Sequence, residues 1–281
     1  MKRLILHAGM PKTGSTSIQK SLYYGLEDPR FRYLGFGQVN GSLAMEMLYS
    51  ASPESILLHQ LLGRSEADVS AMRRRLERRL QEGLHHCARR GAVPIISAEL
   101  CWRMTADALT RLRNDFASRG YETEVLVYVR PLPEWYPSAF QQYVKCAGFG
   151  FVPFGPFHAA PGARDEADLA SGLDTLDAVF GVPHVRVAAF ESTQLHGGCI
   201  VSDFCHRLGI DLPTKRILRA NEALGLDATR LLYTYYSQGP GYGRGPTVMK
   251  ENALLQRRLE CLKGPAFRYH ASLLRSRADF I

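Results

Sequence analysis

The sequence lacks most of the patterns that assign a chain to a class at first sight. Its six cysteines are scattered and form no C-x-x-C pair, which argues against a structural zinc site and a disulfide-stapled secreted scaffold. No apolar run approaches the roughly 20 residues that span a membrane, and no Gly-Lys-[ST] triplet marks an ATP- or GTP-binding loop. The amino terminus leads into an apolar strand pattern rather than a signal peptide, so we expect free thiols in a cytoplasmic protein.

The composition is that of an ordinary globular protein with a basic surface. A chain of 281 residues, 46% of them hydrophobic, can form one large α/β domain or two small ones; we expect a single domain over residues 1–281. The net charge of +8 favours anionic partners such as a polyphosphorylated nucleotide, an acidic glycan or a membrane surface. Because the sequence shows no Lys/Arg-rich tail and no nucleic-acid-binding motif, nucleic acid is not the expected partner. The oligomeric state is left open.

Short apolar segments alternate with segments of helical periodicity along the chain. This alternation predicts an α/β fold of three layers, with a central, mostly parallel sheet flanked by helices. The predicted strands are residues 3–8, 31–34, 93–97, 124–130 and 185–190. The predicted helices are residues 15–25, 54–62, 65–90, 105–119, 133–146, 172–180, 199–208 and 221–238. Ligands of such sheets bind beyond the carboxyl ends of the strands, so we expect the functional site at that edge.

The helix predicted over residues 65–90 has a clear start and a basic surface. Ser65 followed by Asp68 is close to a capping box. Five arginines between residues 73 and 79 form either a solvated face paired with nearby glutamates or a docking surface for an acidic acceptor. Two Gly- and Pro-rich segments, residues 147–164 and 239–245, are expected to be a substrate-side loop and a mobile loop.

One stretch carries clear chemistry: residues 7–19, His-Ala-Gly-Met-Pro-Lys-Thr-Gly-Ser-Thr-Ser-Ile-Gln. It lies between a predicted strand and a predicted helix, where the helix dipole and the first backbone N–H groups favour an anionic group. Lys12 adds a full positive charge, and Gly14 lets the backbone approach a ligand closely. Hydroxyl donors follow at Ser15, Thr16 and Ser17. The alternative is a Ser/Thr-rich turn that only caps the helix.

A second candidate anion site follows the clearest predicted strand. Arg130 ends that strand, and Ser138 lies about two turns into the next predicted helix. An arginine fork together with a helix hydroxyl suits a phosphate monoester. The alternatives are a surface ion pair for Arg130 and a solvent-facing position for Ser138.

Both segments resemble motifs of the sulfotransferases that use 3′-phosphoadenosine-5′-phosphosulfate (PAPS). The run Pro-Lys-Thr-Gly-Ser-Thr resembles their 5′-phosphosulfate loop, and Val-Tyr-Val-Arg-Pro with its later serine resembles their 3′-phosphate motif. The resemblance implies a P-loop NTPase-like sulfotransferase fold, with 3′-phosphoadenosine-5′-phosphate (PAP) as product. It implies that the cofactor is bound by Lys12, Thr13, Gly14, Ser15, Thr16, Ser17, Arg130 and Ser138. Cytosolic aryl and steroid members carry a tryptophan where Ser17 stands, so the similarity is to the bacterial and carbohydrate branches, and adenine must be held otherwise.

The resemblance also implies the catalytic groups. Members of the family use a histidine at the end of the second core strand, or a glutamate, as the base that deprotonates the acceptor. Here that strand ends Ser-Ala-Glu, so the predicted catalytic residues are Glu99 as base and Lys12, which would neutralise the leaving phosphate. The alternative for Glu99 is a cap or an ion pair with Arg103, and His7 is expected to pack in the sheet. No metal is expected, because lysine and the helix dipole can supply the positive charge.

The sequence therefore predicts a sulfotransferase that moves a sulfuryl group from PAPS to an acceptor hydroxyl or amine. The similarity to the carbohydrate branch and the basic surface favour a carbohydrate or glycolipid acceptor. One rival is a nucleotide or small-molecule kinase, which should carry Gly-Lys-[ST] and an aspartate at a strand end for Mg²⁺. The other rival is a non-catalytic module that binds PAP or a sulfated ligand, and such a module would be indifferent to Glu99.

Overall fold

The computed structural model describes residues 1–145, 154, 165–220, 223–238, 246–262 and 264–269. The chain divides into two compact units. The first unit holds residues 1–130 and 167–220, and the second holds residues 131–166 and 221–281. Each unit is described by itself below, and the single domain expected from the sequence stays a prediction.

The first unit is built on a five-stranded sheet in the order β2–β3–β1–β4–β5, in which every neighbouring pair is parallel. The strands are β1 (Lys2–His7), β2 (Phe31–Tyr33), β3 (Val93–Ser97), β4 (Tyr121–Val129) and β5 (Val185–Ala189). The predicted α/β class and parallel sheet are confirmed. Strand β4 begins earlier than predicted, because buried Tyr121 and Thr123 alternate with glutamates that hide the apolar pattern.

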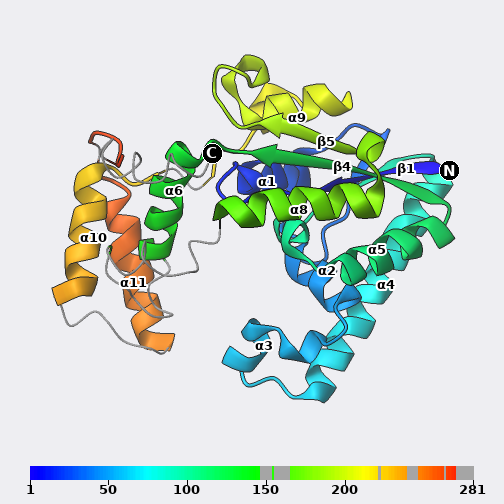
Figure 1. The fold of residues 1–281 in the computed structure, drawn as a ribbon, viewed down its shortest axis with the longest axis horizontal. Helices are drawn as coiled ribbons and strands as arrows, with labels where there is room; N and C mark the ends of the chain where they lie inside the picture. Colours follow the sequence, from blue (N-terminus) through cyan, green and yellow to red (C-terminus); the bar gives the residue numbers. More distant parts are fainter. Residues whose placement is uncertain (146–153, 155–164, 221–222, 239–245, 263, 270–281) are drawn as a thin grey trace. The chain divides into compact units, whose positions relative to one another are not determined.

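Helices cover both faces of this sheet. Figure 1 shows α9 on one side of the sheet and α8, α5 and α4 on the other. The α-helices that lie wholly or mainly in this unit are α1 (Ser15–Gly25), α2 (Ser42–Tyr49), α3 (Leu57–Leu61), α4 (Glu66–Arg90), α5 (Ala106–Ser118), α8 (Asp165–Phe180) and α9 (Ile200–Leu208). Short 3₁₀ helices are η1 (Pro53–Ser55), η2 (Glu99–Arg103), η4 (Val182–His184), η5 (His196–Gly198) and η6 (Thr214–Arg216). The three-layer arrangement therefore follows the predicted alternation of strands and helices.

Helix α4 confirms the start signals read from its sequence. The Ser65 side chain accepts the Asp68 N–H while the Asp68 carboxylate accepts the Ser65 N–H, which is a complete capping box. Arg73 pairs with Glu77 one turn away at 3.3 Å, as the solvated-face interpretation expects. The helix predicted over residues 54–62 is instead the turn η1 followed by the short α3, and α2 was not predicted. A short, almost continuously apolar segment such as α2 shows no amphipathic spacing that would reveal a helix.

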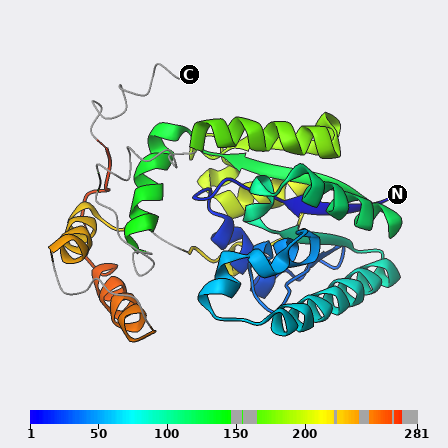
Figure 2. The same ribbon diagram turned by 60° about the horizontal axis from the view of Figure 1, so that its bottom comes forward.

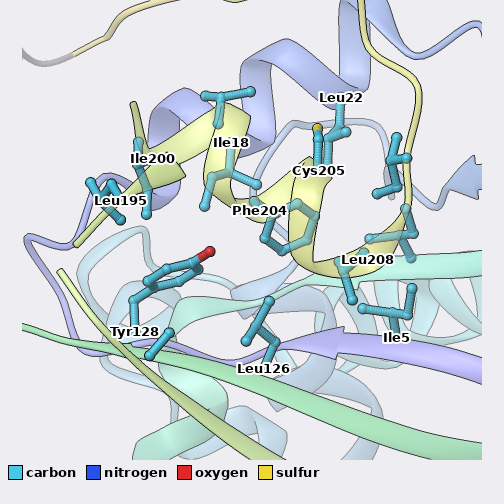
Figure 3. Packing of buried hydrophobic residues seen from close by; sticks show 14 residues of the cluster. Ile5, Ile18, Leu22, Leu126, Tyr128, Leu195, Ile200, Phe204, Cys205 and Leu208 are labelled. Carbon is cyan, nitrogen blue, oxygen red and sulfur yellow. The ribbon is translucent and has the colours of Figure 1, made fainter. Parts of the chain in front are cut away.

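Helices α1 and α9 pack together over one face of the sheet (Figure 3). Ile18 and Leu22 of α1 join Phe204 and Leu208 of α9 in one buried cluster with Leu126 of β4. Burial of each such side chain stabilises the fold by about 1.5–3 kcal/mol. This layer therefore fixes the position at which α1 begins, and with it the loop that connects β1 to α1.

A buried carboxylate ties α9 to the sheet. Asp203 accepts hydrogen bonds from the Tyr128 hydroxyl at 2.7 Å, from Arg207 Nε at 2.5 Å and from the His196 N–H at 3.0 Å. Figure 3 shows the Tyr128 hydroxyl pointing toward α9. Burial alone raises the pKa of Asp203, but these hydrogen bonds outweigh it and the pKa is lowered. The carboxylate therefore stays charged and holds α9 against β4.

The second unit is a small helical assembly. Its helices are α6 (Leu132–Lys145), α10 (Leu226–Gln238) and α11 (Pro246–Leu259). Figure 1 and Figure 2 both show α10 and α11 lying side by side. Phe140 and Val144 of α6 pack with Leu232 and Tyr236 of α10 and Leu259 of α11. The loops predicted at residues 147–164 and 239–245 lie outside the described residues, apart from Phe154.

The described cysteines agree with the expectation of free thiols. They are Cys87, Cys101, Cys199, Cys205 and Cys261. Within the described ranges, no helix has the length and apolarity needed to cross a membrane.

Candidate functional site

The loop after β1 has a backbone shaped for an anion. Lys12 has a φ of 70°, and it is the one non-glycine residue with a positive φ in the part of the chain that the structure describes. Gly14 follows with a φ of 79° and is the N-cap of α1, where it contributes no side-chain cap. Residues that alternate between right- and left-handed backbone conformations can direct successive N–H groups toward one anion. The start of α1 adds further N–H groups, because no side chain caps them. The strain at Lys12, on the order of 1 kcal/mol, is typical of a functional site.

Gly14 is required for packing as well as for its backbone conformation. A Cβ added there would lie 2.9 Å from Ile200 Cγ2 and 3.3 Å from the Phe190 ring. The loop therefore lies directly against the start of α9 and the end of β5, and any side chain at Gly14 would push it away.

The inner side of the same loop is lined by polar atoms. A Cβ added at Gly9 would lie 3.4 Å from His7 Nε2, 3.6 Å from Thr13 Oγ1 and 3.7 Å from Ser15 Oγ. Thr13 is fully buried and donates its hydroxyl to the Met10 carbonyl at 2.7 Å, which braces the loop. The Ser15 hydroxyl is buried and makes no hydrogen bond to any described residue. A buried hydroxyl without a hydrogen-bond partner could donate to an oxygen atom of a bound ligand.

Arg130 lies against this loop. It follows β4, and its Nη1 donates a hydrogen bond to the Lys12 carbonyl at 3.1 Å. Its guanidinium carbon is 5.4 Å from the centre of the Phe190 ring, a cation–π distance. The two predicted anion-binding segments, separated by more than a hundred residues in sequence, are therefore in contact within the first unit.

Glu99 lies at the same edge, at the first position of η2 after β3. Burial is the largest influence on its carboxyl and raises the pKa, while the positive charge of Lys12 acts in the opposite direction. Burial is the stronger of these influences, so the pKa is raised overall. The positive charge of Lys12 therefore acts on the Glu99 carboxyl.

The remaining predicted cofactor residues differ in their surroundings. Thr16 is half-buried in the first turn of α1. The Ser17 hydroxyl accepts the Ala220 N–H at 3.0 Å, so it joins α1 to the segment before the second unit. Ser138 is half-buried on α6 in the second unit. Its predicted partnership with Arg130 stays a prediction.

Phe190 was missed as a site residue by reasoning from the sequence. It follows β5 directly and supports both Gly14 and Arg130. The signal was available, because every residue just beyond the carboxyl end of a parallel strand is a candidate. The sequence analysis placed Phe190 only as the last residue of the strand predicted over residues 185–190.

His7 packs in the sheet, as expected, and is fully buried. The Tyr128 and Phe204 rings form T-shaped pairs with its imidazole at centroid distances of 6.0 and 5.3 Å. Burial lowers the pKa of His7 to about 4, so the side chain is neutral at physiological pH. His158, in the predicted substrate loop, lies outside the described residues.

Comparison with known proteins gives a fold. No protein-family model matches the chain, and no curated protein matches its sequence. Among solved structures, a sulfotransferase from Alicyclobacillus acidocaldarius matches over 98% of this chain and 100% of that chain, with 15% identity and a TM-score of 0.50. The chain has a sulfotransferase-like fold.

Two further structures are similar at lower scores. A sulfotransferase domain from the curacin biosynthetic pathway matches over 94% of this chain and 99% of that chain, with 10% identity and a TM-score of 0.40. A structure from the PezAT toxin–antitoxin system of Streptococcus pneumoniae matches over 92% of this chain and 85% of that chain, with 14% identity and a TM-score of 0.34. At these identities the similarity shows the fold alone. Any catalytic activity has to be argued from the residues at the edge of the sheet.

The buried neutral His7 predicts acid sensitivity. Its pKa of about 4 in the folded protein lies below the 6.5 of an exposed histidine, so the unfolded chain takes up the proton first as pH falls. Stability is therefore lost as pH falls from about 6.5 to about 4, and about 2 kcal/mol should be lost between pH 7 and pH 5. Urea unfolding of the wild type and of His7→Gln at both pH values measures this contribution, which the variant should lack. An equal loss in both proteins would contradict it.

Proposed function

We propose that this chain is a PAPS-dependent sulfotransferase that transfers a sulfuryl group to an acceptor hydroxyl or amine. The observation that carries the proposal is the contact between Arg130 and the Lys12 carbonyl. It brings the two segments that resemble the 5′-phosphosulfate loop and the 3′-phosphate motif together at one sheet edge. A nucleotide with phosphates at both its 5′ and 3′ positions requires two such cation-bearing segments at one site.

The residues of the loop fit the 5′-phosphosulfate group. The φ values of Lys12 and Gly14 and the uncapped start of α1 provide backbone donors for an anion. The orphaned Ser15 hydroxyl beside Gly9 provides a buried side-chain donor. Lys12, Thr13, Gly14, Ser15, Thr16 and Ser17 would hold this end of the cofactor. Arg130, together with Ser138, would hold the 3′-phosphate.

The chemistry divides between Lys12 and Glu99. PAPS, when bound, supplies a sulfuryl group joined to a phosphate leaving group. Lys12 places positive charge where the leaving phosphate gains negative charge. Glu99 would act as the general base and accept the proton of the acceptor hydroxyl on a carboxylate oxygen. Because burial raises the pKa of Glu99, its basicity lies closer to that required near neutral pH.

The acceptor that we propose is a carbohydrate or glycolipid. Its support is the similarity to the carbohydrate branch in the motif sequences and the net charge of +8, which favours acidic acceptors and membrane surfaces. We propose a single functional domain over residues 1–281.

Binding of PAP tests the cofactor assignment. Calorimetry of the wild type should detect PAP with micromolar or tighter affinity and ATP at least tenfold more weakly. Lys12→Ala and Arg130→Ala should each weaken PAP binding by about 10- to 100-fold, because each removes a charge-assisted contact to phosphate. The control Arg119→Ala removes an exposed arginine that pairs with Asp115 on α5, and it should leave PAP binding unchanged. Tight ATP binding without a response to PAP would indicate a kinase and contradict the proposal.

Turnover by a Glu99 variant separates an enzyme from a binding module. Glu99→Gln preserves the shape of the side chain but cannot accept the proton, so PAP formation from PAPS with a panel of sugar and phenol acceptors should fall by about 10²- to 10⁴-fold. PAP affinity should stay within about threefold of the wild type. Normal turnover by Glu99→Gln would remove Glu99 from the mechanism. Tight PAP binding by a wild type that transfers nothing would favour the non-catalytic module.

A further inference from the structure

Helix α4 carries positive charge that the proposed function does not use. It has seven arginines and four acidic residues, and two of these acids lie in its first turn, where Asp68 completes the capping box. Arg73 pairs with Glu77. Among the residues that the structure describes, the other six arginines of α4 form no ion pair, and neither does Glu82. By contrast, six arginines elsewhere in the first unit pair with acidic side chains: Arg3, Arg30, Arg119, Arg186, Arg207 and Arg216. Unpaired positive charge is therefore concentrated on α4.

Three of the unpaired arginines lie on one exposed side of the helix. Arg74, Arg78 and Arg89 are exposed, and they follow one another at intervals of four and eleven residues. Four residues make about one turn and eleven make about three, so these side chains project from one side of α4 along about 22 Å of its axis. The opposite side is buried through Leu76 and Leu80. Figure 2 shows α4, in cyan, along the border of the first unit.

Strand β2 extends this exposed side beside the last turns of α4. A Cβ added at Gly83 of α4 would lie 3.0 Å from Leu34 Cδ2, just beyond β2. The Val93 N–H, just beyond α4, donates to the Arg30 carbonyl at 2.8 Å, just before β2. Arg32 lies on β2 between these two contacts, and its side chain is exposed. The strand therefore places a further arginine beside the carboxyl end of α4.

His86 is influenced by the positive charge gathered at this end of α4. Arg32 is the strongest influence on the pKa of His86 and lowers it, while burial, Arg90 and Arg89 lower it further. Three guanidinium groups from two elements thus act on one imidazole. Like charges gathered in this way repel each other, and a polyanion bound across them would relieve the repulsion.

Arg79 leads from these arginines toward the proposed base. Gly37, in the loop after β2, has a φ of 91°, and a Cβ added there would overlap the Arg79 guanidinium. Arg79 therefore lies directly against the backbone of this loop. The loop reaches Gly41, whose N–H donates to the Ser97 carbonyl at 2.8 Å. Glu99 follows two residues later, so the arginines of α4 continue to the edge of the sheet that carries Glu99.

We infer that these arginines bind a linear acidic polysaccharide and direct it toward Glu99. The arginine surface is formed by Arg32, Arg74, Arg78, Arg79, Arg89 and Arg90. Carboxylate or sulfate groups repeated along a chain would each accept charge-assisted hydrogen bonds from a guanidinium fork. The acceptor role of the polysaccharide rests on the proposed function, whereas its binding to the arginine surface does not.

The composition of α4 favours a polysaccharide over a membrane. An interfacial helix buries large hydrophobic side chains among the lipid headgroups. Every residue of α4 is described, and none of its large hydrophobic side chains is exposed. Leu58 and Leu62 are exposed, but they precede α4, at the end far from Arg89 and Arg90. Binding to a membrane is therefore an outcome that the test has to exclude.

Binding of an acidic oligosaccharide tests the arginine surface. A fluorescent octamer of polygalacturonate should bind the wild type at low salt and lose affinity as salt is added, whereas neutral maltooctaose should not bind. The triple variant with Arg74→Gln, Arg78→Gln and Arg89→Gln should bind the octamer at least about tenfold more weakly, because it removes three cationic contacts. No binding of the octamer by the wild type would overturn the inference, and PAP binding would still decide the proposed function.

A matched variant separates the arginine surface from net charge. Arg186→Gln, Arg257→Gln and Arg258→Gln together remove three exposed arginines from β5 and α11, with the same loss of charge. The affinity of this variant for the octamer should stay within about twofold of the wild type. An equal loss of affinity in both triple variants would contradict the inference. Binding of the wild type to phosphatidylglycerol vesicles without binding to the octamer would assign the surface to a membrane and contradict it as well.

Hydrogen exchange tests the path toward Glu99. The octamer should slow the exchange of the backbone amides in residues 35–41 by at least about threefold in the wild type, and not in Arg79→Gln. The PAP affinity of this variant should stay within about twofold of the wild type, because Arg79 lies outside the proposed cofactor site. Unchanged exchange of residues 35–41 on octamer binding would overturn the proposed direction of the polysaccharide while leaving the proposed cofactor site in place.

Discussion

The hydrogen bond from Arg130 to the Lys12 carbonyl is the interaction on which the account of this site depends. It exists because β1 pairs with β4 in parallel, with His7 beside Leu126, so that the residues following both strands emerge at one edge. Because β1 also pairs with β3, with His7 beside Ser97, Glu99 emerges at the same edge. Three segments distant in sequence thus meet because the sheet is parallel, and neither the loop nor the arginine could make the site alone.

The site is also where local rules of folding are broken. Lys12 adopts a backbone conformation that normally belongs to glycine, and Ser15 and His7 each bury a polar atom without a hydrogen bond among the described residues. Glu99 is a carboxyl group whose burial raises its pKa. A fold accepts such costs where the surrounding core is strong, and here the cluster formed by α1, α9 and the sheet supplies that core. The backbone strain and the buried polar atoms are consistent with a loop that is preorganised to bind an anion.

Much of the fold could be predicted from the sequence, because helix starts and strands are marked by short-range patterns. The helix of residues 15–25, the Ser65 capping box and strand β3 depend on short-range patterns, and the structure confirms them. The short α2 was lost because its apolar residues show no period, and the start of β4 was hidden by glutamates. At the site, the residue types of Lys12, Glu99 and Arg130 and their places after strands were visible. Other features could not be predicted, because they arise from tertiary packing that no local pattern encodes. These are the hydrogen bond from Arg130 to the Lys12 carbonyl, the contacts of Phe190 and the polar atoms around Gly9.

The central claim is that the loop and the arginine bind opposite ends of one nucleotide. The most direct measurement is a crystal structure of the full chain with PAP. We expect the 5′-phosphate within hydrogen-bonding distance of the backbone N–H groups from Lys12 to Thr16, and the 3′-phosphate in contact with the Arg130 guanidinium. A structure in which PAP touches only one of these two segments, or binds away from this edge of the sheet, would contradict the account.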